Sequence, residues 1–283
     1  MKYGAAYALT ALPDPIAVRD IAQAYEGAGL DFVGVGGHVL CQPDGTHQRP
    51  AMTYVGPFYD HMVMFSYLAA VTQRIHFVSA ILILPEFPTA VVAKQAAELA
   101  FFSNNRFEMG IGISWSGPEY QAMGQDLHTR GARMAEQVQV LRKMWTEPFV
   151  SFQGKYHSLD NIGLNRLPSA PIPIWFGTGL GEERVLRRVA RLADGWMPLG
   201  DPTPALPHMR ELMQAAGRDP SSLMVRAGVT AGNDGPASWI AAAKALQSAG
   251  VTHVNIGTPP DLAPADAQKR IIEARTILSR EVG

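Results

Sequence analysis

The sequence predicts a (β/α)8 barrel of the TIM type, an α/β fold, and three observations support this prediction. Short apolar runs without polar alternation stop at Gly or Pro at residues 31–36, 106–112, 194–198 and 252–257. Such runs are typical of strands that are buried on both faces, as parallel strands are. Helical stretches alternate with these runs along the whole chain. The 283 residues also suit one barrel of about 250 residues, so we expect a single domain over residues 1–283.

The first half of the chain predicts four strand–helix units. The expected strands are residues 2–9, 32–36, 75–84 and 107–112, and the expected helices are residues 15–28, 60–72, 88–102 and 130–145. Pro15 and Gly29 mark the two ends of the first helix. Insertions are expected after the second strand and, as a Ser/Gly/Pro turn, after the fourth. The long first insertion, residues 39–59, is interpreted as a lid that covers the site.

The second half predicts four more units. Residues 150–167 first interrupt the alternation, and their aromatic, Gly and Asn content indicates a hairpin outside the barrel. The expected strands are then residues 174–177, 196–199, 223–230 and 252–256, and the expected helices are residues 182–193, 205–216, 237–249 and 264–279.

Composition excludes several classes of protein. The net charge of −1 provides no basic field for nucleic acid or an anionic membrane surface. A single cysteine, Cys41, excludes an intramolecular disulfide framework and a cysteine-based zinc site. No apolar run reaches the roughly 18 residues of a membrane span, and the N-terminal run is interpreted as the first strand rather than a signal peptide. We therefore expect a soluble cytoplasmic protein.

The residues that follow the strands should face the active site of such a barrel. They include few carboxylates and one histidine, His38, so we expect neither a metal site nor a titratable acid–base pair. An apolar mouth with few charges favours an organic cofactor that brings its own reactivity. The glycine turn at residues 177–181 lies between a strand and a helix, where backbone N–H groups can bind an anion. Its spacing fits no dinucleotide or P-loop motif, and a plain tight turn is the alternative.

Ordered motifs along nearly the whole chain resemble a known family. They are Ala-Gly-Leu-Asp-Phe at 28–32, Ile-Leu-Ile-Leu-Pro at 81–85, Arg-Phe-Glu-Met-Gly-Ile-Gly at 106–112, and further motifs at 130–133, 141–148 and 193–198. This series resembles the bacterial-luciferase-like oxidoreductases, and most closely the branch that depends on the deazaflavin coenzyme F420.

The resemblance implies a flavin or deazaflavin that lies across the strand ends, with a non-proline cis peptide bond behind its central ring. The matching pair here is Ala80–Ile81. The implied cofactor-binding residues are Ser79, Ala80, Ile81 and Gly112 near the ring, and Gly177, Thr178, Gly179 and Leu180 near the phosphate.

His38 matches the family histidine that contacts the cofactor or exchanges a proton. Imidazole titrates near neutral pH, so it can supply the proton that accompanies a hydride. The alternative is a histidine that only hydrogen-bonds a neighbouring loop.

Two residues depart from the family pattern. Gly37 stands where members often have Asp, and Trp115 stands where the sugar-phosphate dehydrogenases of the family have Glu. We therefore expect neither oxidation of a sugar phosphate nor a mechanism that needs a His/Glu acid–base pair. Trp115 either offers an apolar face to a substrate or wedges its own loop. Tyr54, in the predicted lid, is the second substrate-binding candidate.

The leading hypothesis is an oxidoreductase that transfers a hydride between coenzyme F420 and a small, mostly apolar organic substrate, with His38 exchanging the proton. The first alternative is an FMN-dependent monooxygenase that uses reduced flavin and oxygen. The second is a non-catalytic barrel that binds a flavin or another ligand. The resemblance also implies a homodimer.

Overall fold

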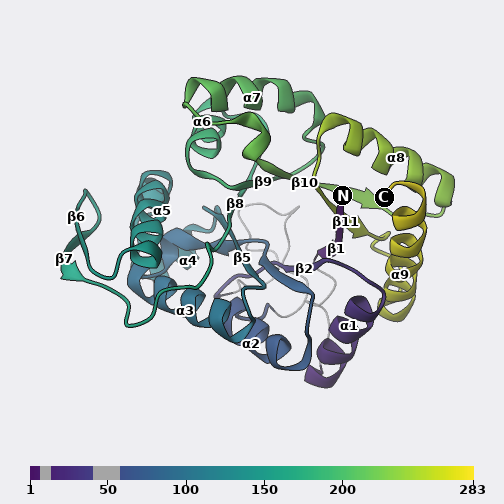
Figure 1. Ribbon diagram of the computed structural model, residues 1–283, viewed down its shortest axis with the longest axis horizontal. Helices are drawn as coiled ribbons and strands as arrows, with labels where there is room; N and C mark the ends of the chain where they lie inside the picture. The colour runs from purple at the N-terminus through teal and green to yellow at the C-terminus, as the bar shows by residue number, and fades with distance from the viewer. Residues whose placement is uncertain (7–13, 41–57) are drawn as a thin grey trace.

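The computed structural model describes residues 1–6, 14–40 and 58–283, and these form the predicted barrel (Figure 1). Its strands are β1 (Lys2–Ala6), β2 (Phe32–Val35), β3 (His76–Ser79), β4 (Leu82–Ile83), β5 (Phe107–Gly112), β8 (Ile174–Thr178), β9 (Gly195–Pro198), β10 (Met224–Thr230) and β11 (His253–Gly257). Neighbours pair in parallel in the order β3-β2-β1-β11-β10-β9-β8-β5-β4. A further pairing of β3 with β5 closes the barrel, because β3 and β4 are two parts of one strand.

Helices surround the barrel in Figure 1. They are α1 (Pro15–Gly27), α2 (His61–Val71), α3 (Thr89–Phe102), α5 (Arg130–Thr146), α6 (Glu183–Leu192), α7 (Leu206–Ala215), α8 (Pro236–Ala249) and α9 (Pro264–Glu281). The carboxylates of Asp14 and Asp60 cap α1 and α2 by accepting from Ile16 N and Val63 N. Among the helices that the structure describes, none has the length and apolar character that a membrane span requires.

Two local features were predicted correctly. The strands β6 (Val150–Gln153) and β7 (Ser158–Ile162) form an antiparallel hairpin that lies outside the barrel beside α5 (Figure 1). The peptide bond between Ala80 and Ile81 is cis and separates β3 from β4.

The insertion after β5 differs from its prediction. The expected Ser/Gly/Pro turn contains a short helix, α4 (Gly117–Ala122). The Ser116 side chain accepts a hydrogen bond from Glu119 N and caps this helix, while Pro118 lies in its first turn. Ser116 and Glu119 have the spacing of a capping box, a signal that the Gly and Pro content of the segment outweighed.

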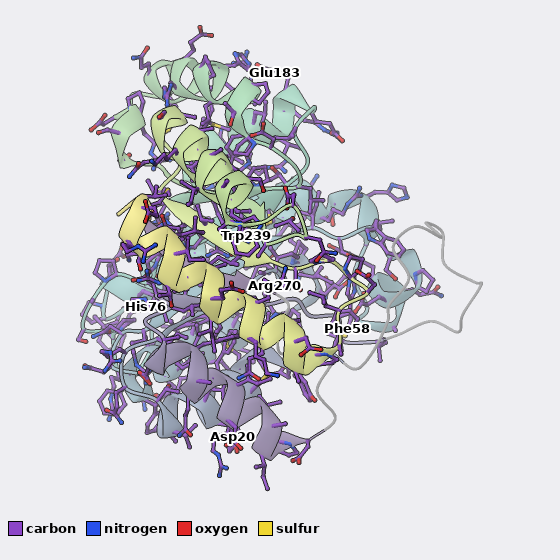
Figure 2. All side chains as sticks on the ribbon, turned by 90° about the vertical axis from the view of Figure 1, so that its right-hand side faces the viewer. Asp20, Phe58, His76, Glu183, Trp239 and Arg270 are labelled. Atoms are coloured by element: carbon purple, nitrogen blue, oxygen red, sulfur yellow. The ribbon has the colours of Figure 1, made fainter. Side chains whose placement is uncertain are left out.

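The core has two parts. Apolar residues of the helices pack on the outside of the strands, whereas Phe32, Val78, Ala80, Trp175 and Met197 form a separate cluster. Figure 2 shows α8 and α9 crossing the outside of the barrel, with the Arg270 guanidinium 5.7 Å from the centre of the Trp239 ring. In the same view His76, at the start of β3, and Phe58, which lines the cavity described below, lie on opposite sides of the molecule.

Two charged side chains that are buried near the strand starts, those of Glu108 and Arg106, have hydrogen-bond partners. Glu108 accepts hydrogen bonds from His76 Nδ1 at 2.9 Å and Trp175 Nε1 at 2.8 Å. Burial opposes the charge of this carboxyl, but the hydrogen bond and charge of His76 prevail and lower the pKa of Glu108 to about 2. The buried Arg106 guanidinium donates to the backbone oxygens of Ala69, Thr72, Ser103 and Ile75. The motif at 106–112 therefore stabilises the amino end of the barrel as well as forming β5.

Candidate functional site

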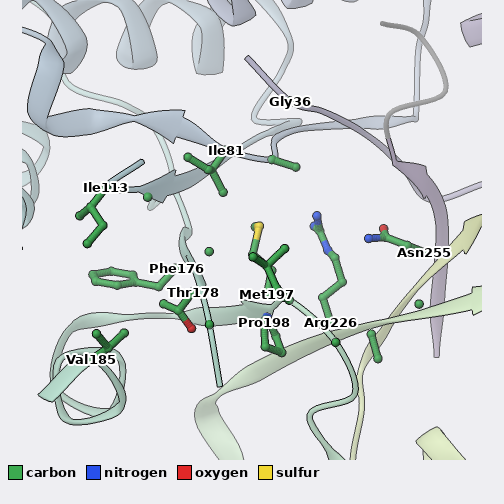
Figure 3. A pocket seen from close by; sticks show the side chains of 18 of the residues that line it. Gly36, Ile81, Ile113, Phe176, Thr178, Val185, Met197, Pro198, Arg226 and Asn255 are labelled. Atoms are coloured by element: carbon green, nitrogen blue, oxygen red, sulfur yellow. The ribbon is translucent and has the colours of Figure 1, made fainter. Parts of the chain in front are cut away.

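A cavity of about 1170 Å³ opens at the carboxyl ends of the strands (Figure 3). Most of the predicted site residues line it. They are His38, Ala80, Ile81, Gly112, Trp115, Gly177, Thr178 and Gly179. The volume exceeds the 300–1,000 Å³ that is typical of small-molecule sites, so both a cofactor and a substrate have room.

Three predicted residues are not among those that line the cavity. The fully buried Ser79 hydroxyl donates to Gly110 O at 2.8 Å and accepts from Gly110 N at 2.9 Å, so it links β3 to β5. Leu180 is half-buried and packs against the core. Tyr54 lies outside the described residues.

Ile81 forms one wall of the cavity, and two glycines make room for it. A Cβ atom on Gly112 would lie 2.6 Å from Ile81 Cδ1, and one on Gly177 would lie 2.4 Å from Ile81 Cγ2. Figure 3 shows Met197 and Arg226 pointing toward Ile81 from the opposite wall. Apart from Arg226, the lining between these side chains is mostly apolar, which suits the faces of an organic ring.

Arg226 places a positive charge in this wall, and sequence reasoning missed it. Its guanidinium lies 4.5 Å from the centre of the Phe32 ring and 4.8 Å from that of Trp175, and the residue is 2% exposed. Arg226 lies within β10, whereas the sequence argument for the site rests on residues that follow the strands. A charged side chain inside an otherwise apolar strand was the available signal.

The glycine turn lines the cavity through Gly177, Thr178 and Gly179. A Cβ atom on Gly179 would meet nothing within 4 Å, and Trp196 Nε1 fixes Thr178 by donating to its Oγ1 at 2.8 Å. Arg130 and Arg188 also line the cavity, from α5 and α6. Backbone N–H groups, a helix N-terminus and two guanidinium groups together suit an anion such as a phosphate. Arg184 is 80% exposed and pairs with Glu182, as expected of a solvated helix residue.

His38 has a carboxylate partner, which corrects the prediction that no titratable pair exists. Its Nδ1 lies 2.7 Å from Oε2 of Glu119, whose side chain is 2% exposed. Glu119 lies in α4 and is neither of the two positions, 37 and 115, at which family members carry a carboxylate. A His/Glu pair is thus present in the site.

A second carboxyl group, Glu86, is fully buried just after β4. Neither of its oxygens has a hydrogen-bond partner among the described residues. Burial, and then the charge of Glu119, raise the pKa of Glu86 to about 8. Within residues 1–6, 14–40 and 58–283, no group of three or more His, Cys, Asp or Glu side chains could hold a metal ion.

Nearly the whole sequence matches a protein family. The match to "Luciferase-like monooxygenase" extends over residues 3–280. The chain belongs to this family. The luciferase-like protein is 34% identical over 230 residues to "Uncharacterized protein Rv0940c" of Mycobacterium tuberculosis, covering 77% of this chain and 76% of that one. It is 27% identical over 216 residues to an F420-dependent glucose-6-phosphate dehydrogenase of Nakamurella multipartita, covering 72% and 60% of the two chains.

Solved structures share the fold of this luciferase-like protein. An F420-dependent secondary alcohol dehydrogenase in complex with an F420-acetone adduct superposes with a TM-score of 0.80 at 17% identity, covering 98% of each chain. The long-chain alkane monooxygenase LadA gives the same TM-score at 13% identity, covering 99% of this chain and 91% of that one. Both structures share the fold of this chain; one is that of an F420-dependent dehydrogenase and the other that of a monooxygenase.

Proposed function

We propose that this protein is an oxidoreductase that transfers a hydride between coenzyme F420 and a small, mostly apolar organic substrate. One observation carries the proposal: a single cavity is lined by His38, whose Nδ1 contacts the Glu119 carboxylate behind it, by an apolar wall and by a glycine turn beside two arginines. The relationship to an F420-dependent dehydrogenase at 27% identity supports the choice of cofactor. A bound deazaflavin would supply the hydride-transfer chemistry at its C5.

The residues present fit such a coenzyme. Ala80, Ile81 and Met197 provide apolar surface for the faces of the ring. Backbone N–H groups of the turn at residues 177–179, together with Arg130 and Arg188, would hold the phosphate. The buried Arg226 would favour the more negatively charged form of the ring.

His38 would exchange the proton that accompanies the hydride. The centre of the Trp115 ring lies 6.4 Å from that of His38, so an apolar substrate could pack on Trp115 while its polar atom meets the histidine. We retain Trp115 and Tyr54 as proposed substrate contacts. This arrangement favours an alcohol, a carbonyl compound or an activated alkene.

One observation favours a second candidate function, an FMN-dependent monooxygenase. The chain is 36% identical over 133 residues to a pyrimidine monooxygenase of Allorhizobium ampelinum, covering 45% of this chain and 35% of that one. An FMN phosphate would suit the same turn and arginines.

A fluorescence titration with coenzyme F420 and, separately, with FMN tests the proposal. We expect saturable micromolar binding of F420 and weaker binding of FMN. Arg188→Ala should weaken F420 binding about tenfold or more, the effect of about 1.4 kcal/mol. Arg184→Ala, on the exposed side of the same helix, should not. A preference for FMN would support the monooxygenase, and binding of neither would refute both redox functions.

A further inference from the structure

The partner of His38 is held more firmly than a surface ion pair would be. Glu119 Oε2 lies 2.7 Å from His38 Nδ1, and Oε1 accepts from Val39 N at 2.7 Å and from Leu40 N at 3.1 Å. The carboxylate thus accepts hydrogen bonds from the two backbone N–H groups that follow His38 and also contacts the imidazole ring. Because Ser116 caps α4 at Glu119 N, the backbone that carries this carboxyl is fixed too.

The arrangement determines which ring nitrogen carries the proton. A carboxylate can only accept a hydrogen bond, so the neutral imidazole must carry its proton on Nδ1. We propose that Glu119 is a positioning residue that holds His38 as the Nδ1–H tautomer and thereby makes Nε2 the proton-transfer atom. This inference rests on the function proposed above, in which His38 exchanges a proton with the substrate.

The proton and electron balance is simple. In the oxidation of an alcohol, His38 Nε2 would take the hydroxyl proton, and the bound coenzyme would accept the hydride from the carbon that carries the hydroxyl group, so that a carbonyl compound forms. Glu119 faces the imidazolium ion and neutralises its charge until the proton leaves to solvent. Carbonyl reduction follows the same steps in reverse.

Glu86 supplies a matched control. It is a second buried carboxyl group whose charge interacts with that of Glu119, but among the described residues its oxygens make no hydrogen bond to His38. Replacing Glu86 by Gln therefore removes a neighbouring carboxyl group without removing the acceptor of Nδ1.

The substitution Glu119→Gln should reverse the tautomer. Its amide oxygen would accept from Val39 N and Leu40 N, as Glu119 Oε1 does. The amide NH2 group would then face His38 Nδ1, which must accept, so the proton moves to Nε2. If Glu119 only linked α4 to the backbone of residues 39–40, Glu119→Gln would leave the tautomer of His38 unchanged.

Long-range ¹H–¹⁵N NMR of the ¹⁵N-histidine-labelled protein without coenzyme tests the inference, with His38 assigned from the signal lost in His38→Gln. At a pH where the ring nitrogen shifts show a neutral imidazole, we expect Nδ1–H in the wild type and in Glu86→Gln, and Nε2–H in Glu119→Gln. Nε2–H in the wild type, an unchanged tautomer in Glu119→Gln, or a reversed tautomer in Glu86→Gln would each overturn the inference. If Glu119→Gln fails to fold, the tautomer of His38 in the wild type still tests the inference: Nδ1–H supports it and Nε2–H overturns it.

The two proposals can fail separately, because the NMR measurement uses no coenzyme and the titration with F420 does not depend on the tautomer. We expect Glu119→Gln to bind F420 within about twofold of the wild type, since Glu119 is not among the residues that line the cavity. A larger loss would show that Glu119 holds the coenzyme and would overturn its assignment as a positioning residue.

Discussion

Two buried carboxyl groups near His38 differ in their surroundings. Glu119 accepts three hydrogen bonds, whereas the oxygens of Glu86 have no hydrogen-bond partner among the described residues. A buried carboxyl group without donors is more stable when protonated, and the neighbouring charge of Glu119 adds to this preference. Because Glu86 is buried without hydrogen-bond donors, its ionisation at alkaline pH lowers the free energy of unfolding.

Glu86→Gln should stabilise the protein at alkaline pH. The folded state raises the pKa of Glu86 from 4.5 to about 8, so this group disfavours folding increasingly as pH rises through that interval. The gain in unfolding free energy should be small at pH 5 and on the order of 3 kcal/mol at pH 8. Urea unfolding at both pH values measures it, with Glu273→Gln as an exposed control. A variant that is less stable than the wild type at pH 8 would contradict this explanation.

At the scale of elements, the glycines of the strand ends have different tasks. Gly177 makes room for Ile81, whereas Gly179 borders open cavity space. The first therefore serves packing, and the second leaves space for a ligand.

The variants Gly177→Ala and Gly179→Ala should separate these tasks. Gly177→Ala should lower the unfolding free energy by about 1–3 kcal/mol, because its methyl group overlaps Ile81. Gly179→Ala should change stability by less than about 0.5 kcal/mol but weaken F420 binding about tenfold, because the methyl group occupies the proposed phosphate space. Thermal unfolding and fluorescence titration provide the two readouts. Unchanged F420 binding in Gly179→Ala would show that the turn does not border the phosphate of the coenzyme.

Elements with a local pattern could be predicted from the sequence, and contacts between distant residues could not. Residues 107–112 were placed correctly because a strand buried on both faces leaves a continuous apolar run. The pairing of His38 with Glu119 spans 81 positions and depends on the short helix α4, which the composition concealed. Ser79 faces Gly110 because of the local geometry of β3, which the family motif did not reveal.

At the scale of the whole molecule, buried neutral histidines make folding sensitive to acid. Burial lowers the pKa of His61 and lowers that of His253 to about 3. Both rings take up protons more readily when the chain unfolds, so their contribution to stability is present above pH 6.5 and is lost as pH falls.

The unfolding free energy should therefore decrease between pH 6.5 and 4.5, and His253 alone should contribute about 1 kcal/mol per pH unit to this decrease. His253→Gln should reduce that slope, even though it lowers stability overall, while the exposed His128→Gln should leave the slope in place. Urea unfolding across this pH range measures both. An equal slope in His253→Gln and the wild type would show that His253 is not held neutral in the fold.

The central claim is that the cavity at the strand ends holds the coenzyme, and a crystal structure of the protein with F420 tests it most directly. We predict that the deazaflavin ring lies between the Ala80–Ile81 wall and Met197, with its phosphate within hydrogen-bonding distance of backbone N–H groups at residues 177–179. A ring bound elsewhere, or a phosphate that contacts neither this turn nor Arg130 and Arg188, would contradict the account.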